Sequence, residues 1–164
     1  MGYRIGIGQD SHAFLPEKEK KKCIVAGLAF PDAPGLDADS DGDVVFHAIC
    51  NAITSLTHLP ILGGVAIDLC HKFGITDSSV YLAKALETLG SRRVEYVALT
   101  IEGRRPKFQE RSNEMRDNIS LAMHLAIDQV GITFSSGDGL TSFGRGEGLI
   151  CFCLLTTLSK KDKD

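Results

Sequence analysis

Five segments of the chain carry a β-type pattern of hydrophobic positions, and each is predicted to be a strand. They are residues Tyr3–Gly8, Cys23–Phe30, Val94–Glu102, Ile132–Ser136 and Leu149–Leu158. Apolar residues recur at helical spacing in three further segments, Val44–Thr57, Val80–Leu89 and Phe108–Leu125. Residues 77–79 provide a cap for the second of these helices and Gly90 ends it, whereas residues 66–74 fit neither pattern.

The order of these elements, β-β-α-α-β-α-β-β, predicts an α+β fold in which helices cover one face of a mixed sheet. The last predicted strand is apolar on both sides, at positions 150, 152 and 154 and at positions 151, 153 and 155. Strands of this kind are buried on both faces of their sheet. We therefore expect the open face of the sheet to pack against other subunits.

Composition narrows the class of protein. The length of 164 residues fits one compact domain, and 43% hydrophobic with 24% charged residues excludes a disordered chain. A net charge of −3 argues against a dedicated nucleic-acid binder. No apolar run is long enough to cross a membrane, and the N-terminus lacks the pattern of a signal peptide. Five irregularly spaced cysteines fit free thiols in a reducing cytoplasm better than a disulfide framework.

The end of the first predicted strand carries a candidate pair of metal ligands, Asp10 and His12. Residues i and i+2 of an extended segment point to the same side, so this carboxylate and imidazole converge. With a third ligand from elsewhere they would form the open site of a catalytic zinc ion. Taken alone, Asp-x-His is more often a turn at the end of a strand.

A second candidate group lies at the start of the first predicted helix, in the segment Ser40-Asp41-Gly42-Asp43 followed by His47. Asp43 lies four residues before His47 and would share its helix face, so we expect its carboxylate to hold the His47 ring in a ligating tautomer. The alternative is a capping loop followed by a buried polar histidine.

Two loops carry groups suited to phosphate. Ser135, Ser136 and Asp138, followed by residues Phe143–Gly148, combine hydroxyl groups, free backbone N–H groups and a carboxylate. These groups suit a phosphate with a hard divalent cation, although a Gly-rich segment is usually a plain hairpin loop. Residues Arg104–Lys107 suit a phosphate or nucleotide, although such basic runs are more often surface turns.

Together these pieces resemble one family, the 2-C-methyl-D-erythritol 2,4-cyclodiphosphate synthases of the non-mevalonate isoprenoid pathway. The resemblance covers nearly the whole chain. It is carried by three motifs in order: Arg4–His12 (R-I-G-x-G-x-D-x-H), Ser40–Ala48 (S-D-G-D-V-x-x-H-A) and Gly144–Gly148 (G-R-G-E-G). The resemblance implies that Asp10, His12 and His47 bind one Zn²⁺, or another divalent transition metal, per subunit.

The resemblance also implies a homotrimer with active sites between subunits. The substrate would be 4-diphosphocytidyl-2-C-methyl-D-erythritol 2-phosphate. Its 2-phosphate attacks the β-phosphorus, so that a cyclic diphosphate forms and CMP leaves. Asp138 would bind a Mg²⁺ or Mn²⁺ ion that bridges the diphosphate, and Ser136 would stabilise the transition state beside Ser135.

Further substrate contacts follow from the same resemblance. Gly103, Pro106 and Lys107 map onto the segment that holds the cytidine. The sugar pocket maps onto Ile61, Gly63, Asp68, Phe73 and Ser78, with residues 66–70 as a flexible loop. Ser40 and Ser142 also map onto substrate-binding positions, and Arg145 onto a cavity on the trimer axis that accepts isoprenoid diphosphates.

The chain departs from the family pattern at several of these positions. Asp39 stands where the family has a catalytic histidine that donates a hydrogen bond to the transferring phosphate, a role that an ionised carboxylate cannot fill. Ile61 replaces an aspartate, Asp138 replaces a glutamate, and Cys70 replaces the last aspartate of the loop. Two alternative functions remain open: a zinc-dependent phosphoesterase acting on a nucleoside diphosphate ester, and a non-catalytic trimer that binds isoprenoid diphosphates.

Overall fold

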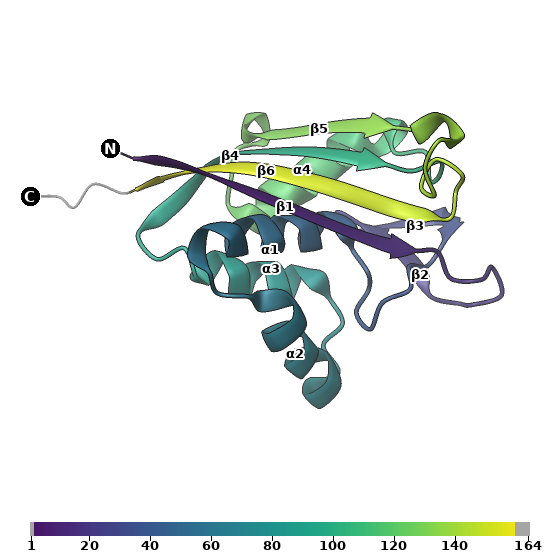
Figure 1. Cartoon of the computed structure of the whole chain (residues 1–164), viewed down its shortest axis with the longest axis horizontal. Coiled ribbons are helices and arrows are strands. Elements are labelled where there is room, and N and C mark those ends of the chain that lie inside the picture. The colour runs from purple at the N-terminus through teal and green to yellow at the C-terminus, as the bar shows by residue number, and fades with distance from the viewer. Residues whose placement is uncertain (1, 160–164) are drawn as a thin grey trace, which may run out of the picture.

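The computed structural model describes residues 2–159, and a four-stranded mixed sheet forms its upper layer (Figure 1). The sheet has the order β1 (Tyr3–Ala13), β6 (Gly148–Ser159), β4 (Arg92–Glu102), β5 (Val130–Ser135). β6 pairs antiparallel with β1 and β4, and β4 pairs parallel with β5. The α+β class and the mixed sheet predicted from the sequence are confirmed.

The helices lie on one face of this sheet (Figure 1). α1 (Val44–Thr57) packs on β1 and β6, α4 (Ser112–Met123) packs on β5, and α3 (Ser78–Glu87) lies beside both helices. The segment η1 (Ile61–Val65) and α2 (Ala66–Phe73) project away from the sheet. No single helix within residues 2–159 is long and apolar enough to cross a membrane, and the one pair of that length, Val44–Thr57 with Ile61–Phe73, is bent by 99°.

Close packing of α1 on β1 depends on two glycines. A Cβ atom added to Gly6 would lie 2.3 Å from the Ala52 carbonyl oxygen, and one added to Gly8 would lie 2.2 Å from that of Ala48. Side chains at these positions would push the helix away from the strand. Because residues of one strand face alternate, the same face next presents Asp10 and then His12 toward α1.

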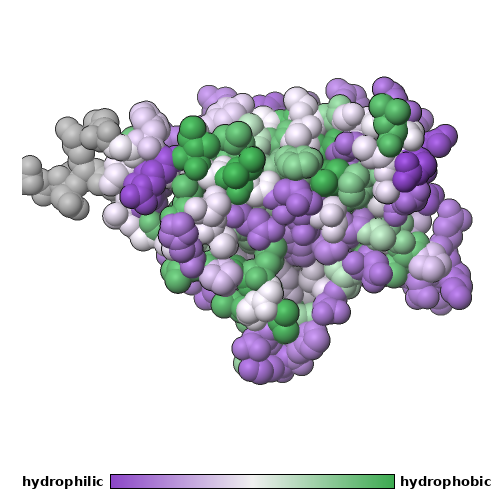
Figure 2. Space-filling view, in the orientation of Figure 1, coloured by the Kyte–Doolittle hydropathy of each residue, from purple (hydrophilic) through white to green (hydrophobic). Residues whose placement is uncertain are grey.

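The opposite face of the sheet is apolar and uncovered in the single chain. Ile5 and Ile7 are 64% exposed, and Phe152 and Leu154 are 44% exposed. Figure 2 shows hydrophobic residues at the surface over the strands. Their neighbours Cys151, Cys153 and Leu155 are buried under the helices, as the two-sided pattern of the last strand predicted.

Some predicted boundaries are wrong. The strand expected over Cys23–Phe30 is a hairpin of β2 (Lys22–Val25) and β3 (Leu28–Pro34). Its turn residues Ala26 and Gly27 have φ values of 54° and 72°, the backbone of a tight two-residue hairpin turn. The helix expected to begin at Phe108 starts with the short 3₁₀ turn η2 (Gln109–Arg111) and becomes α-helical at Ser112.

Candidate metal centre and substrate cavity

Three side chains converge where β1 ends against the first turn of α1. The Asp10 carboxylate oxygen Oδ2 lies 3.0 Å from His12 Nε2 and 3.0 Å from His47 Nδ1. The two ring nitrogens are 3.3 Å apart. We call Asp10, His12 and His47 the triad. The sequence-based expectation that these three residues share one site is confirmed in its geometry.

The start of α1 is fixed by Asp43, which is fully buried and caps the helix. Its carboxylate accepts hydrogen bonds from the backbone N–H groups of Val45 and Phe46, and also from those of the β2–β3 turn, Ala26 and Gly27. One side chain therefore joins the helix to the hairpin and places His47, one turn further on, against β1.

The expectation that Asp43 holds the His47 ring is wrong, because its carboxylate is turned to these backbone groups. Serine hydroxyls take that place. His47 Nε2 lies 2.9 Å from Ser78 Oγ and 3.4 Å from Ser40 Oγ. Ser78 Oγ donates its own proton to Asp41, so it accepts the Nε2–H proton of His47. A proton held on Nε2 leaves Nδ1, the nitrogen that faces Asp10, available as a ligand when a metal ion is bound.

The carboxylates of Asp10, which is partly exposed, and Asp43, which is fully buried, differ in their electrostatics. Burial alone would raise the pKa of Asp10, but hydrogen bonds from His12 and His47 outweigh it and lower the pKa to about 2. Burial and the nearby Asp41 raise the pKa of Asp43 to about 6, against the opposing effect of its backbone N–H donors. Asp10 is therefore the ionised group of the centre at neutral pH, as a metal ligand must be.

The donor set of the triad fits a zinc ion. Zinc takes imidazole nitrogen and carboxylate oxygen in a tetrahedron with bonds of about 2.0–2.2 Å, so two ligand atoms lie about 3.3 Å apart. The three separations of 3.0, 3.0 and 3.3 Å are close to that edge length. Three protein ligands leave a fourth position for substrate or water, which is typical of a catalytic site.

A cavity of about 230 Å³ opens above the triad. Besides the triad, it is lined by residues 38–40, Leu62, Gly63, Ala66, Ile67, Cys70 and Tyr81. The Tyr81 ring stacks on His47 with ring centroids 6.3 Å apart. Three predicted substrate or catalytic positions, Asp39, Ser40 and Gly63, are thus brought to one cavity.

The other positions predicted for the sugar pocket lie elsewhere. Ile61 is only 5% exposed and Ser78 is fully buried, and neither lines this cavity, so their assignment to the substrate stays a prediction. Ser78 supports the His47 ring. Asp68 and Phe73 lie on the solvent side of α2, where Asp68 pairs with Lys72 at 3.1 Å and Phe73 is 70% exposed.

A second group of predicted residues lies at the ends of β4 and β5, with β6 between it and the triad's strand. The backbone N–H of Gly103 donates to the Ser135 carbonyl, and Ser136 Oγ donates to Asp138 Oδ1 at 2.9 Å. Asp138 lies in the short turn η4 (Gly137–Gly139) with a φ of 46°. Hydroxyl groups and a carboxylate are therefore gathered at one end of two parallel strands.

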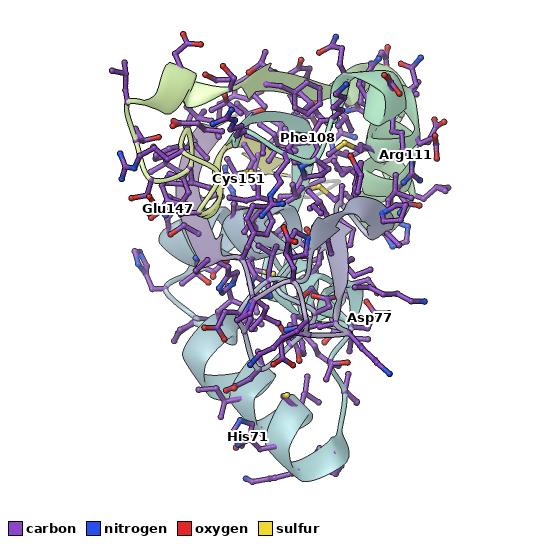
Figure 3. The ribbon with its side chains drawn as sticks, turned by 90° about the vertical axis from the view of Figure 1, so that its right-hand side faces the viewer. His71, Asp77, Phe108, Arg111, Glu147 and Cys151 are labelled. Carbon is purple, nitrogen blue, oxygen red and sulfur yellow. The ribbon has the colours of Figure 1, made fainter. Side chains whose placement is uncertain are left out.

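Four more predicted residues extend this second group. The Lys107 backbone N–H donates to Asp32, next to a cis peptide bond at Pro106. Arg145 is half-exposed, pairs with Glu147 at 2.8 Å and donates to Ser142 Oγ at 3.0 Å. Arg145 belongs to the Gly144–Gly148 turn and Ser142 lies just before it, and Figure 3 shows Glu147 of this turn at the edge of the molecule.

Sequence reasoning assigned no specific role at the centre to three residues: Asp41, Tyr81 and His71. Asp41 accepts from both the backbone N–H and the hydroxyl of Ser78, and so fixes that hydroxyl against His47. His71 Nε2 lies 3.1 Å from Asp39 Oδ2 at the mouth of the cavity. The acidic loop around Asp41 was visible in the sequence, but the partners of Tyr81 and His71 lie more than 30 residues away.

Comparison with known proteins shows the family to which the chain belongs. Residues 3–158 match the sequence profile described as the YgbB family. The chain is 56% identical over 155 residues to the 2-C-methyl-D-erythritol 2,4-cyclodiphosphate synthase of Chlamydia caviae, covering 94% of this chain and 88% of that protein. It is 52% identical over 157 residues to the enzyme of the same name from Chlamydia trachomatis serovar D, covering 95% and 88%.

Solved structures carry the same fold. A structure of 2C-methyl-D-erythritol-2,4-cyclodiphosphate synthase superimposes with a TM-score of 0.83 at 27% identity, covering 94% of this chain and 100% of that one. A second structure of the synthase, described as its CDP-bound form, gives a TM-score of 0.80 at 26% identity with the same coverage.

Proposed function

Because the chain belongs to the YgbB family, we propose that it is an enzyme that converts 4-diphosphocytidyl-2-C-methyl-D-erythritol 2-phosphate to 2-C-methyl-D-erythritol 2,4-cyclodiphosphate and CMP. The observation that carries the proposal is the triad of Asp10, His12 and His47 at the base of a cavity. In class terms the reaction is that of a phosphorus–oxygen lyase in isoprenoid synthesis.

An oxygen of the substrate's 2-phosphate forms a bond to the β-phosphorus, and the bond from that phosphorus to the oxygen bridging it to the α-phosphorus breaks. The electron pair leaves with CMP, so no protein nucleophile is needed. Zn²⁺ at the triad and Mg²⁺ or Mn²⁺ at Asp138 supply charge neutralisation and polarisation of the phosphates when bound. The protein's own task is to hold the attacking oxygen and the β-phosphorus in line.

The proposed reaction also needs ligands for a second divalent ion and for the cytidine, which the resemblance assigns to the second group. Residues of the second group, beyond β6, supply hydroxyl and carboxylate ligands but lie at other strand ends. We assign the complete site to two adjacent subunits of a homotrimer, one giving the triad and the next giving the second group. The uncovered apolar face, with Ile5, Ile7 and Phe152 exposed, supports such an assembly.

Within the second group, each residue is given a role by the resemblance. Asp138 binds the second divalent ion, and Ser135 and Ser136 hold the phosphates through their hydroxyls. Gly103, Pro106 and Lys107 receive the cytidine. Ser142 completes this binding surface, while Arg145 lines the trimer axis and there accepts an isoprenoid diphosphate. These assignments use groups that are half-buried or exposed and therefore open to a ligand, apart from Gly103 and Pro106, which offer backbone.

On the triad side, Gly63 and Ser40 line the cavity. Asp68 and Phe73, on the solvent side of α2, are assigned to the sugar by the resemblance alone. Asp43 supports the centre indirectly by capping α1. The five cysteines are free, four of them buried, which supports a reducing compartment and hence a cytoplasmic location.

The test is to incubate the protein with the CDP-linked substrate, Zn²⁺ and Mg²⁺ and to follow phosphorus by NMR. Appearance of the cyclic diphosphate with an equal amount of CMP supports the proposal. Linear hydrolysis products would instead identify a zinc-dependent phosphoesterase. An unchanged spectrum would overturn both catalytic functions and leave the non-catalytic, isoprenoid-diphosphate-binding trimer.

A further inference from the structure

The loop that carries Asp39 is held firmly at the mouth of the triad's cavity. Lys21 Nζ donates to the Ala38 carbonyl at 2.6 Å, and Ser40 Oγ accepts from the Gly42 backbone N–H at 3.2 Å. The Asp41 backbone N–H donates to the Thr76 carbonyl. Between these anchors the Asp39 side chain is 75% exposed, and the residue lines the cavity. Its carboxylate therefore faces whatever enters.

Helix α2 reaches this carboxylate from the other side of the mouth. His71 Nε2 lies 3.1 Å from Asp39 Oδ2, and Cys70 Sγ donates to the Asp39 carbonyl at 3.3 Å. An ionised carboxylate only accepts hydrogen bonds, so His71 is the donor in either of its charge states. Figure 3 shows His71 on the helix that projects furthest from the sheet. The Asp39–His71 contact thus joins two walls of the cavity.

The negative charge of Asp39 is the reason that this contact affects the binding of an anionic ligand. A diphosphate that approaches the triad passes a carboxylate of the same sign, which would weaken its binding. The hydrogen bond from His71 draws that carboxylate toward α2 and partly screens its charge from the cavity. Because both partners are more than half exposed, the pair adds little to folding stability. Its effect on ligand binding can therefore be measured without loss of the fold.

We propose that His71 is a positioning residue for the substrate diphosphate, which it admits by masking the charge of Asp39 and by holding α2 against the mouth of the cavity. This inference rests on the proposed function for the identity of its ligand. It assigns a role to a residue pair that none of the sequence motifs contains. Cys70, which bonds the same residue through its thiol, assists in holding α2.

A double-mutant cycle tests the proposal in the zinc- and magnesium-loaded protein. His71→Ala removes the hydrogen bond to the Asp39 carboxylate, whose charge then repels the diphosphate. KM should therefore rise about 3- to 10-fold, with a smaller change in kcat. Asp39→Ala, alone or combined with His71→Ala, removes the negative charge itself, so both of these variants should have a lower KM than His71→Ala alone. His71→Lys supplies another hydrogen-bond donor to Asp39 and should stay near the unsubstituted protein.

A merely structural role gives a different pattern. If the pair only fastens α2, both single variants and the double variant share one KM, and that result overturns the proposal, as does an unchanged KM in His71→Ala. The matched control is the Lys84–Glu87 pair on α3, which is also exposed (45% and 64%) and 3.1 Å long, replaced by two alanines. Zinc content and melting temperature should be unchanged in every variant.

Failure of the proposed function remains distinguishable in the same experiment. If the unsubstituted protein makes no product, the proposed function fails, and the cycle is then read from the dissociation constant of CDP by calorimetry. A weaker affinity in His71→Ala that the double variant restores supports the role of His71 without turnover. An affinity for CDP that is identical in all variants refutes it.

Discussion

The hydroxyl oxygen of Ser78 lies 2.9 Å from Nε2 of His47, at the ring nitrogen that does not face Asp10. The first turn of α3 thus orients the ring of a candidate metal ligand on another helix. The contact continues to Asp41, which accepts the serine proton. The acidic loop that precedes α1 therefore acts on the metal centre through Ser78 rather than through Asp43.

This contact predicts that Ser78→Ala keeps all three ligands but loses the group that orients one of them. Zinc affinity should fall about 10- to 100-fold, as is usual when such a supporting hydrogen bond is removed. His47→Ala and His12→Ala should lose the zinc entirely. Competition with a fluorescent chelator measures the affinities. Ser79→Ala is the control, because only the backbone of Ser79 takes part in the cap, and an equal loss there would contradict this account.

Asp43→Asn should act on folding more than on the metal. An amide cannot satisfy the four backbone N–H groups that converge on the buried carboxylate, so the free energy of unfolding should drop by about 1–3 kcal/mol. Urea denaturation measures this change. Zinc affinity under native conditions should move by less than in Ser78→Ala. The reverse order of effects would show that Asp43 supports the His47 ring after all.

Stability of the metal-free protein should depend on Asp10 in acid. Its folded-state pKa of about 2 lies below the ordinary value of 3.8, so its contribution is present above about pH 4 and disappears as the pH falls through 2. The difference corresponds to about 2 kcal/mol. Urea midpoints of the unsubstituted protein and Asp10→Asn, taken in chelator from pH 5 to pH 2, should converge toward the acid end. A constant gap would refute the assignment.

Phe152→Lys should dissociate the proposed trimer. The substitution puts a charge into the middle of the exposed apolar sheet face, where burial against a neighbouring subunit would leave it unpaired. Light scattering should report a monomer at micromolar concentration. Leu121→Lys is the matched control, because Leu121 is 74% exposed on α4, away from this face, and should leave the trimer intact. A monomeric unsubstituted protein would contradict the assembly itself.

The sequence was sufficient to predict the parts of the molecule that depend on local pattern. The alternation along β1 placed Asp10 and His12 on one face, and helical spacing gave α1 its bounds of Val44–Thr57. The hairpin at Ala26–Gly27 was missed because its two strands are short and share one apolar run. Its turn also uses an alanine at a positive φ, which carries no compositional signal.

Contacts between distant segments could not be predicted in the same way. The spacing of Asp43 and His47 suggested a pair. The Asp43 carboxylate instead accepts hydrogen bonds from backbone N–H groups of a hairpin turn 16 residues earlier in the chain. The Ser78–His47 and His71–Asp39 contacts join residues 31 and 32 positions apart. Such pairings depend on where α2 and α3 pack, which no local pattern encodes.

The central claim is that one subunit gives the triad and its neighbour gives the second group, and mixing two inactive variants tests it most directly. His12→Ala lacks a metal ligand, and Ser136→Ala lacks a hydroxyl of the second group. The two proteins are unfolded together, refolded and assayed for cyclic diphosphate by phosphorus NMR. Random mixed trimers should regain activity, with about a quarter of the sites containing two intact halves. A mixture no more active than either variant alone would contradict a site shared between subunits.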